Sequence, residues 1–310
     1  MSGGAVARLF RLVVVVWGKV SPVEPATISI ECTRPLTDSP QTCVNRAGAG
    51  LKPAGLFLHG SRPGVSAWAK WQVALASLGR GFDRRASDLV SFGQSEHPDS
   101  PLQAMSAWFQ AGLTELTALL DTLALERIHL ASNSMGGAIA LLLMWRHPER
   151  GRSAALIGTL EAPFEFTLGR DGDRGFREEP TLERLVQMLR RFVYEPLPVG
   201  VDLEAIARLR DTAAQGPATP RSSTAMFPPP HQRHHDHLVV PADVHASIEQ
   251  QLLLIYERDD QIIPLVTSLH LLRWLPHVQL YGFGQCSHWT QIEARDACHQ
   301  IVESVIAGEI

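Results

Sequence analysis

Ser134 stands at a point of the chain where a catalytic serine could be exposed. Residues 127–131 before it form an apolar stretch typical of a buried strand, and residues 138–145 after it are typical of a helix. A sharp turn between the two would push the serine side chain out of the sheet, where a substrate can reach it. The helix N-terminus behind it would offer free N–H groups and a positive dipole end to a developing oxyanion.

A serine hydroxyl is a weak nucleophile at neutral pH and needs a base within hydrogen-bond reach, a task that suits imidazole. His288 follows the predicted strand 278–281, and Asp259 and Asp260 follow the predicted strand 252–256. An acidic residue would hold the imidazole ring and stabilise the imidazolium that forms during proton transfer. The residue types therefore predict a serine–acid–histidine set, in which both aspartates are candidates for the acid.

Strands and helices alternate along much of the chain, which indicates a mainly parallel sheet with helices on both faces. The expected strands cover 27–32, 55–58, 127–131, 154–158, 252–256 and 278–281, and another ends at the loop 88–95. The expected helices cover 66–79, 104–124, 138–145, 181–195, 201–214, 265–274 and 292–307. The apolar side expected for the first of these helices consists of Trp68, Trp71, Val73, Leu75 and Leu78.

The alternation stops after about residue 162, and we interpret residues 162–238 as a helical lid inserted into a core of residues 51–161 and 239–310. Four histidines in its Pro-, Ser- and Thr-rich part could suggest a metal site. No acidic or cysteine partner stands at ligand spacing, so a solvated surface is the preferred interpretation. These histidines are His231, His234, His235 and His237.

Residues 1–50 have the weakest pattern in the sequence. Residues 8–17 combine basic residues with a short β-branched apolar run, for which we favour a peripheral strand over a signal segment. The run is too short to cross a bilayer as a helix, so no membrane association is expected. Residues 33–53, rich in Pro, Gly, Thr and Ser, are expected to be a loop.

The net charge of −4 provides no basic excess for neutralising phosphates, so nucleic acid is not an expected partner. The cysteines Cys32, Cys43, Cys286 and Cys298 include no C-x-x-C pair, and we expect neither a disulfide framework nor a zinc site. A reducing cytoplasm is the simplest location for such a chain. The sequence leaves the oligomeric state open, and a homo-oligomer is compatible with it.

Several separated motifs resemble the meta-cleavage product hydrolases of the α/β-hydrolase fold, which include the 2-hydroxymuconic semialdehyde hydrolases of bacterial aromatic degradation. The similarity covers roughly residues 54–308. It is carried by H-G-S-R-P-G-V-S-A-W at 59–68, S-N-S-M-G-G at 132–137 and C-S-H-W-T-Q-I-E at 286–293, with shorter matches at 207–210, 225–228 and 260–265.

The resemblance implies hydrolysis of a carbon–carbon bond in a 2-hydroxy-6-oxohexa-2,4-dienoate. In that family the dienol is converted to its keto tautomer, and the activated serine or a water adds to the C6 ketone. The bond then breaks to give 2-hydroxypenta-2,4-dienoate and a carboxylic acid. The ketonised fragment serves as the electron sink, so neither a metal nor an organic cofactor is expected.

The resemblance also implies roles for individual residues. The chain order Ser134, Asp260, His288 is that of the catalytic triad, and Asp260 is favoured because an apolar-apolar-Pro run follows it. The oxyanion donors would be the backbone N–H groups of Ser61 and Met135. Three side chains would bind the dienoate end: Asn133, Arg210 and Trp289. A guanidinium fork matches a carboxylate, and Arg208 is the competing arginine.

Some positions depart from the family pattern. Arg62, Ser132 and Ser287 stand where the family usually has glycine, and Asp211-Thr212 replaces its more frequent Tyr-Glu. A long side chain at Arg62 would narrow the site or strain the loop beside the oxyanion. These departures keep two other functions open, namely a carboxylesterase on the same scaffold and a non-catalytic ligand-binding member of the fold. A haloalkane dehalogenase is disfavoured because its nucleophile would be an aspartate.

Overall fold

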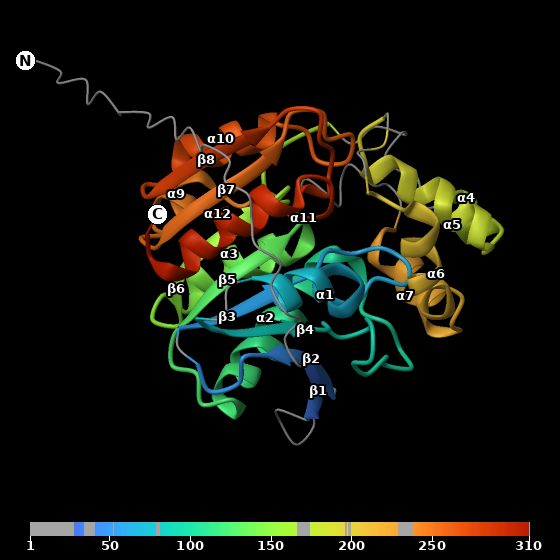
Figure 1. The fold of residues 1–310 in the computed structure, drawn as a ribbon, viewed down its shortest axis with the longest axis horizontal. Coiled ribbons are helices and arrows are strands. Elements are labelled where there is room, and N and C mark those ends of the chain that lie inside the picture. The colour runs from blue at the N-terminus through green and yellow to red at the C-terminus, as the bar shows by residue number, and fades with distance from the viewer. Residues whose placement is uncertain are drawn as a thin grey trace, which may run out of the picture.

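The computed structural model describes residues 28–33, 41–51, 53–78, 81–165, 174–195, 197, 200–228 and 238–309. Within these residues the strands form an eight-stranded sheet in the order β1-β2-β4-β3-β5-β6-β7-β8 (Figure 1). Strand β2 pairs antiparallel with both β1 and β4, and all other neighbours are parallel. The strands are β1 Ile28–Thr33, β2 Thr42–Ala47, β3 Ala54–Leu58, β4 Asp83–Ser87, β5 Ile128–Asn133, β6 Gly151–Ile157, β7 Gln251–Glu257 and β8 Val278–Phe283.

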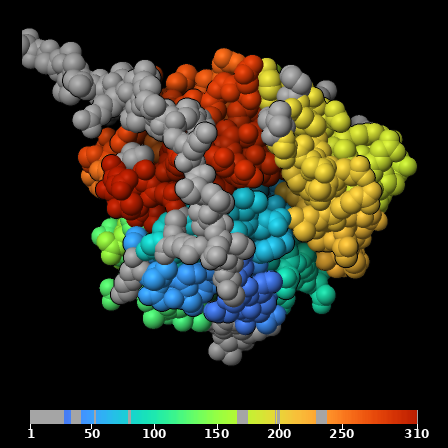
Figure 2. All heavy atoms as spheres, viewed as in Figure 1, coloured from blue at the N-terminus to red at the C-terminus, as the bar shows by residue number. Residues whose placement is uncertain are grey.

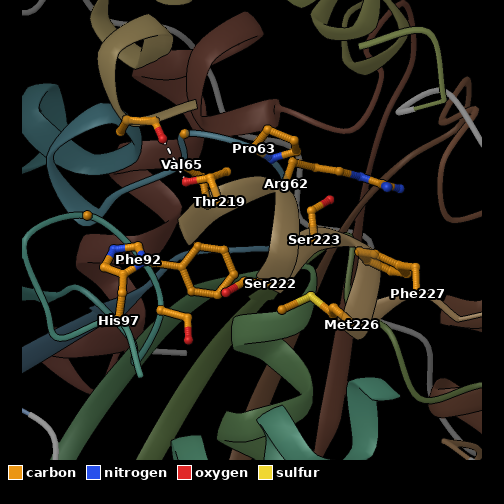
Figure 3. A pocket seen from close by; sticks show the side chains of 14 residues that line it. Arg62, Pro63, Val65, Phe92, His97, Thr219, Ser222, Ser223, Met226 and Phe227 are labelled. Carbon is orange, nitrogen blue, oxygen red and sulfur yellow. Dashed lines mark hydrogen bonds between the residues drawn. The ribbon is translucent and has the colours of Figure 1, made fainter. Parts of the chain in front are cut away.

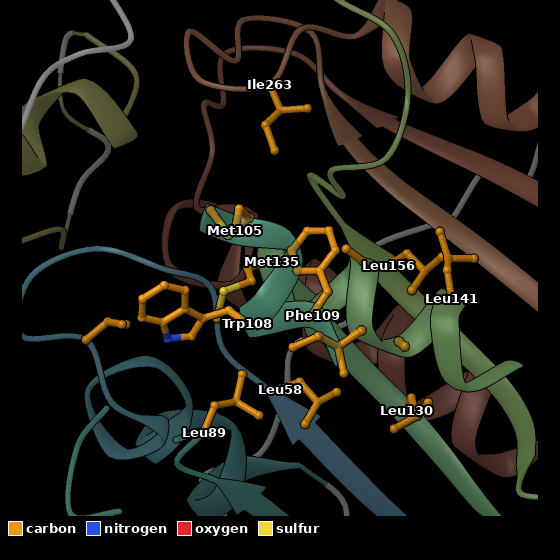
Figure 4. Close-up of a cluster of buried hydrophobic side chains, with 14 of the residues drawn as sticks. Leu58, Leu89, Met105, Trp108, Phe109, Leu130, Met135, Leu141, Leu156 and Ile263 are labelled. Atoms are coloured by element: carbon orange, nitrogen blue, oxygen red, sulfur yellow. The ribbon is translucent and has the colours of Figure 1, made fainter. Parts of the chain in front are cut away.

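Helices cover both faces of this sheet. Successive residues of a strand point to opposite faces, so the apolar side chains on each face are buried by a layer of helices. The core helices are α1 Ala67–Ser77, α2 Ala104–Thr122, α3 Met135–Arg146, α10 Val266–Trp274, α11 Thr290–Glu293 and α12 Arg295–Ala307. Leu56 and Leu58 of β3 belong to a buried cluster with α2 and α3, whereas Phe57 belongs to a second cluster with α1 and α12. Figure 4 shows the first cluster, in which Trp108 and Phe109 of α2 lie among side chains of β3, β5 and α3.

Between β6 and β7 the chain forms a further group of helices. They are α4 Arg174–Glu178, α5 Leu182–Leu189, the 3₁₀ helix η2 Arg190–Phe192, α6 Leu203–Ala214, α7 Ala218–Met226 and α9 Ala242–Ala246. Helices α4 to α7 lie to one side of the sheet, and the space-filling view shows their residues as a block against the core (Figures 1 and 2). Two of these helices begin at N-cap residues. The side chains of Thr181 and Asp202 accept hydrogen bonds from backbone N–H groups in the first turns of α5 and α6.

The prediction that residues 33–53 form a loop is wrong, because they contain β2. Its sequence T-C-V-N-R-A has no apolar run, yet the strand is mostly buried between β1 and β4. Its polar side chains find partners across the sheet, and the Arg46 guanidinium lies 2.7 Å from the Asp83 carboxylate of β4. A strand that is stabilised by such non-local pairs carries little local hydrophobic signal.

The expectation that the cysteines form no disulfide is also wrong. Cys32 of β1 and Cys43 of β2 are directly opposite each other in the antiparallel pair and are joined by a disulfide. Because β2 was expected to be a loop, no sequence pattern indicated that these two positions lie together. Cys286 and Cys298 are free and buried.

Two predicted helices differ in detail from the structure, and one helix of the insertion was not predicted. Val73 is 43% exposed, so it does not belong to the apolar side of α1, whereas Lys70 of the same helix is buried. The closing helix expected at 292–307 is divided into α11 and α12. Within the stretch 215–236, rich in Pro, His, Ser and Thr, the structure contains α7, which the sequence pattern did not indicate.

Two sequence predictions lie outside the described residues, namely the strand at 8–17 and the histidines of 231–237. Among the residues that the structure does describe, no helix combines the length and hydropathy needed to cross a membrane. The same residues contain no group of three or more His, Cys, Asp or Glu side chains that could hold a metal ion.

Candidate active site

The turn from β5 to α3 holds Ser134 in a backbone conformation that few residues adopt. Its φ is 57° and its ψ is −119°, so the chain reverses sharply between strand and helix. The turn is tight, since a Cβ at Gly136 would lie 2.7 Å from the carbonyl oxygen of Leu58 in β3. Ser132, at the position of a family glycine, is fully buried and fits this turn. The serine therefore lies at the carboxyl edge of the parallel strands, where sites of open α/β sheets form.

His288 and Asp260 are hydrogen-bonded at the same edge of the sheet. The distance from Nδ1 of His288 to Oδ2 of Asp260 is 2.8 Å, and both side chains are almost fully buried. The other carboxylate oxygen of Asp260 accepts hydrogen bonds from the backbone N–H groups of Ile262 and Ile263. Asp260 is therefore fixed by three donors, with its charge directed at the imidazole.

Asp259 lies in a different environment. Its carboxylate accepts hydrogen bonds from the guanidinium of Arg258 and from the backbone N–H of Gln285. The Arg258 guanidinium holds the pKa of this carboxyl below its usual value. The structure thus brings Asp260 to His288 and leaves Asp259 in the exposed loop.

The backbone around these side chains is compact. A Cβ at Gly60 would lie 3.0 Å from the Cβ of Ser134, so the loop after β3 adjoins the serine. Met135 is the first residue of α3, where N–H groups have no partner within the helix. Ser61 follows Gly60 directly, which places both predicted oxyanion donors beside the Ser134 turn. A Cβ at Gly158 would lie 3.0 Å from Nδ1 of His288, so the end of β6 adjoins the imidazole.

His59, at the end of β3, has the contacts of a structural residue. Its Nε2 accepts a hydrogen bond from the Leu89 N–H, and its Nδ1 lies 2.7 Å from the Gly60 carbonyl oxygen. Burial lowers the pKa of His59 to about 4, so the ring is neutral at physiological pH.

Asn133 connects the serine turn to the histidine loop. Its Nδ2 donates to the carbonyl oxygens of Ile157 and His288, at 3.1 and 3.3 Å. The side chain is buried and directed between the strand ends. Its amide nitrogen is thus engaged by the protein itself, and only the Oδ1 atom is left for a ligand.

Trp289 is the centre of a group that joins the inserted helices to the core. The Phe192 ring stacks on it with centroids 5.1 Å apart and also lies 5.6 Å from the His288 ring.

The Arg210 guanidinium of α6 lies 5.1 Å from the Trp289 centroid. Arg210 is 2% exposed, and no described residue accepts a hydrogen bond from its Nε or Nη1. Burial lowers the pKa of Arg210 to about 10, so the group keeps its charge.

Arg62 occupies a backbone conformation suited to glycine, with a φ of 137°. Its guanidinium lies 4.9 Å from the ring centroid of Phe227 and 5.7 Å from that of Phe192. The residue lines a hollow between the loop after β3, the loop 91–97 and α7, which also includes His97 and Ser223 (Figure 3). The structure therefore accommodates this departure from the family by a strained loop and contacts with aromatic residues of the insertion.

Glu161, which the sequence analysis did not single out, is a second strained residue near the site. It follows β6 with a φ of 104° and is 2% exposed. Burial raises the pKa of its carboxyl well above the usual value, and no described residue forms a hydrogen bond with it. A positive φ and an unpaired buried acid both cost folding free energy, which is typical of positions retained for function.

Replacing Glu161 with glycine is expected to stabilise the protein. Relief of a strained φ is worth about 1–3 kcal/mol, from which the greater freedom of an unfolded glycine subtracts about 1 kcal/mol. Chemical denaturation of wild type and Glu161→Gly measures the difference, and a less stable variant contradicts the strain argument.

The Glu161→Gln variant removes the ionisable carboxyl and keeps a side chain at the strained φ, so it tests the charge alone. A carboxyl whose folded pKa is raised stabilises the fold below its unfolded pKa, and that contribution is lost as pH rises through the folded pKa. The stability of wild type relative to Glu161→Gln should therefore fall as pH rises above 4.5, the ordinary value for glutamate. A difference that does not change with pH would show that the acid is solvated.

Lys70 is the other residue that sequence reasoning missed. It is buried on α1, and its Nζ lies 4.5 Å from the Trp289 centroid. A lysine within an amphipathic helix normally indicates the solvent face, so the pattern gave no warning. Its position just after the loop motif 59–68 could have indicated that it lies near the site.

The fold and the site define the class of this protein as a serine hydrolase of the α/β-hydrolase fold, whose family model matches residues 56–295. The 2-hydroxymuconate semialdehyde hydrolase of a Pseudomonas species is 38% identical over 82% of this chain and 86% of its own. The 2-hydroxy-6-oxo-2,4-heptadienoate hydrolase of Pseudomonas putida is 35% identical over 87% of this chain and 94% of its own.

A solved structure supports the same grouping. The 2-hydroxy-6-oxo-6-phenylhexa-2,4-dienoate hydrolase of a Rhodococcus species has a TM-score of 0.82 and 29% identity, over 91% of this chain and 99% of that one. The chain belongs to the meta-cleavage product hydrolase family, which cleaves carbon–carbon bonds in aromatic catabolism.

Proposed function

We propose that this protein hydrolyses the bond between C5 and C6 of a 2-hydroxy-6-oxohexa-2,4-dienoate, either 2-hydroxymuconic semialdehyde or a 6-substituted analogue. The observation that carries the proposal is the buried Arg210 guanidinium, which lacks described hydrogen-bond partners at two of its nitrogens. A buried cation in this state calls for an anion, and the carboxylate of a dienoate supplies one.

The proposed roles follow from the geometry. His288, oriented by Asp260, removes a proton from Ser134 or from a water, and the resulting nucleophile adds to the C6 ketone. The N–H groups of Ser61 and Met135 receive the negative charge on the C6 oxygen. The C5–C6 bond then breaks, its electron pair moves through the ketonised fragment to the C2 oxygen, and that fragment leaves as 2-hydroxypenta-2,4-dienoate after taking up a proton. Where Ser134 is the nucleophile, a water activated by His288 then hydrolyses the acyl-serine and releases the carboxylic acid, so no metal or organic cofactor is required.

The helices of residues 162–238 are proposed to act as a lid that decides which C6 substituents fit. Two contacts support this role, since Phe192 of η2 lies against the ring of His288 and Arg210 of α6 lies against Trp289. The size of the C6 substituent would be found from turnover of a panel of 6-substituted dienoates.

Arg210→Met is expected to lower kcat/KM for a dienoate by about thirtyfold or more, which corresponds to about 2 kcal/mol for removing one member of a buried charge pair. Turnover of a small neutral nitrophenyl ester should stay near the wild-type rate, because such an ester brings no carboxylate. The measurement is steady-state kinetics on both substrates, following the loss of dienoate absorbance and the release of nitrophenolate.

Arg208→Met is the matched control on the same helix, since Arg208 is exposed and paired with Glu204. It should leave both activities nearly unchanged. If Arg210→Met reduces the ester and the dienoate reactions equally, the residue supports lid folding instead of binding the carboxylate. A wild type that hydrolyses the ester and no dienoate would favour the carboxylesterase alternative.

The cytoplasmic location is likewise a proposal. The Cys32–Cys43 disulfide is of a kind more common in oxidising compartments, so the location needs a direct test. Fractionation of cells with detection of the untagged protein would provide it, and recovery outside the cytoplasmic fraction would overturn the proposal.

A further inference from the structure

Glu257 is a buried carboxyl that the proposed mechanism does not use. It is the last residue of β7, so it lies at the same edge of the sheet as the catalytic residues. Its side chain is fully buried, and no described residue forms a hydrogen bond with its Oε2 atom. An acid in such a place costs folding free energy, and proteins tolerate costs of this kind mainly at functional sites.

Glu257 connects the strand before Asp260 to the segment that carries His288. Its Oε1 atom accepts a hydrogen bond from the hydroxyl of Thr290, the fully buried first residue of α11, two residues after His288. Its backbone carbonyl accepts a hydrogen bond from the Asp260 N–H at 3.4 Å. Through these two contacts Glu257 binds both segments that meet in the 2.8 Å contact between His288 and Asp260.

The surroundings of Glu257 favour the neutral form of its carboxyl. Burial, which has the largest effect, and the charge of Asp260 raise its pKa well above the ordinary value of 4.5. Lys70 of α1 also acts on it, but the two form no salt bridge, and burial lowers the pKa of this lysine well below its usual value. The described titratable groups that interact with Glu257 come from its own strand, the loop after it, α1, the loop 284–289 and α12, and they are Tyr256, Asp260, Lys70, Cys286 and Cys298.

We propose that Glu257 is a positioning residue for the reaction, whose neutral carboxyl holds Thr290 and thereby keeps His288 directed at Asp260. The inference rests on the proposed function, in which His288 is the base and Asp260 orients it, and it deepens that function. His288 works as the base only while its Nδ1–H points at the Asp260 carboxylate. A neutral acid can hold the histidine segment without adding a second negative charge beside Asp260, which an ionised Glu257 would do.

The test compares variants that remove or keep the contact between Glu257 and Thr290, each first checked for cooperative thermal unfolding. Glu257→Leu and Thr290→Val remove the contact, and each should lower kcat about tenfold with little change in KM, as expected for one buried hydrogen bond. Glu257→Gln keeps a neutral acceptor and Thr290→Ser keeps a hydroxyl, so each should recover most of the lost rate. The double variant Glu257→Leu/Thr290→Val should be no slower than the slower single variant, because both changes break the same contact.

Proton NMR shows whether the contact acts through the imidazole. The hydrogen-bonded Nδ1–H of His288 gives a downfield signal, which should persist in Glu257→Gln and broaden in Glu257→Leu and Thr290→Val. If the latter two proteins fold and keep the wild-type kcat and signal, the contact only supports the fold and the proposal is overturned. A Glu257→Gln variant as slow as Glu257→Leu also overturns it, since the ionised carboxylate would then be the active form. Losses that add up in the double variant contradict it too, because the two residues would then act separately.

The kinetics are measured on a 6-substituted dienoate and on a nitrophenyl ester, which separates this inference from the proposed function. A protein that hydrolyses only the ester, with the expected order of variants, refutes the carbon–carbon cleavage and retains Glu257 as a positioning residue. A protein that cleaves the dienoate equally fast in all these variants refutes the role of Glu257 and leaves the proposed function intact.

Discussion

Replacing Ser134 with alanine is expected to lower kcat for a dienoate by about four orders of magnitude, because members of a catalytic triad act as a unit. Ser134 alone occupies the strained turn at the end of β5, beside the loop after β3. Alanine lacks the hydroxyl that attacks the ketone but keeps the small volume that this turn requires. The measurement is single-turnover kinetics at high enzyme concentration, so that a slow residual rate can be seen.

Ser132→Ala is the matched control for this variant. Ser132 lies two residues earlier on the same strand, is fully buried, and is at 3.4 Å from the Ala155 carbonyl oxygen. It should leave kcat near the wild-type value, because its side chain faces the neighbouring strand. The outcome that contradicts the assignment is a Ser134→Ala variant that binds the dienoate and turns it over at a comparable rate. Such a result would favour a water attacking without the serine.

The sequence predicted the sheet, the strand-to-helix turn and the residues brought to its edge, because each depends on a local signal. Apolar residues in β5, β6 and above all β7 indicate buried strands, and the small residues Ser134 and Gly158 directly follow β5 and β6. In a parallel sheet such turns must meet at one edge, so Ser134, Asp260 and His288 could be placed together from their order alone.

Features that depend on pairing between distant segments could not be predicted in the same way. Strand β2 is held by partners on β1 and β4, and its disulfide follows from that register. The burial of Lys70 has the same origin, since Trp289 lies against it from a segment remote in the sequence, and Glu161 is buried as well. Both break the rule that charged residues face solvent, and proteins tolerate such exceptions mainly at functional sites.

Asp260→Asn is expected to lower kcat on a dienoate by about 10³- to 10⁴-fold, with little change in fold. An asparagine oxygen can still accept the hydrogen bonds from the N–H groups of Ile262 and Ile263, which now bind Oδ1 at 2.6 and 3.0 Å. Its amide group would then face Nδ1 of His288, 2.8 Å from the present carboxylate oxygen. Because the amide donates a hydrogen bond, it favours the tautomer with the proton on Nε2. That tautomer cannot accept the proton of the nucleophile.

Asp259→Asn completes this comparison, since the same chemical change is made one residue earlier. Asp259 is bound to Arg258 and Gln285 at the surface, and its loss should leave kcat within about threefold of wild type. Thermal unfolding of both variants shows whether either change disturbs the loop. If Asp259→Asn proves the more damaging to turnover while both proteins remain folded, then Asp259 is the acid and the Asp260 contact seen here is structural. If Asp260→Asn alone is inactive and its imidazole titrates differently by NMR, the carboxylate acts through the imidazole, as the 2.8 Å contact implies.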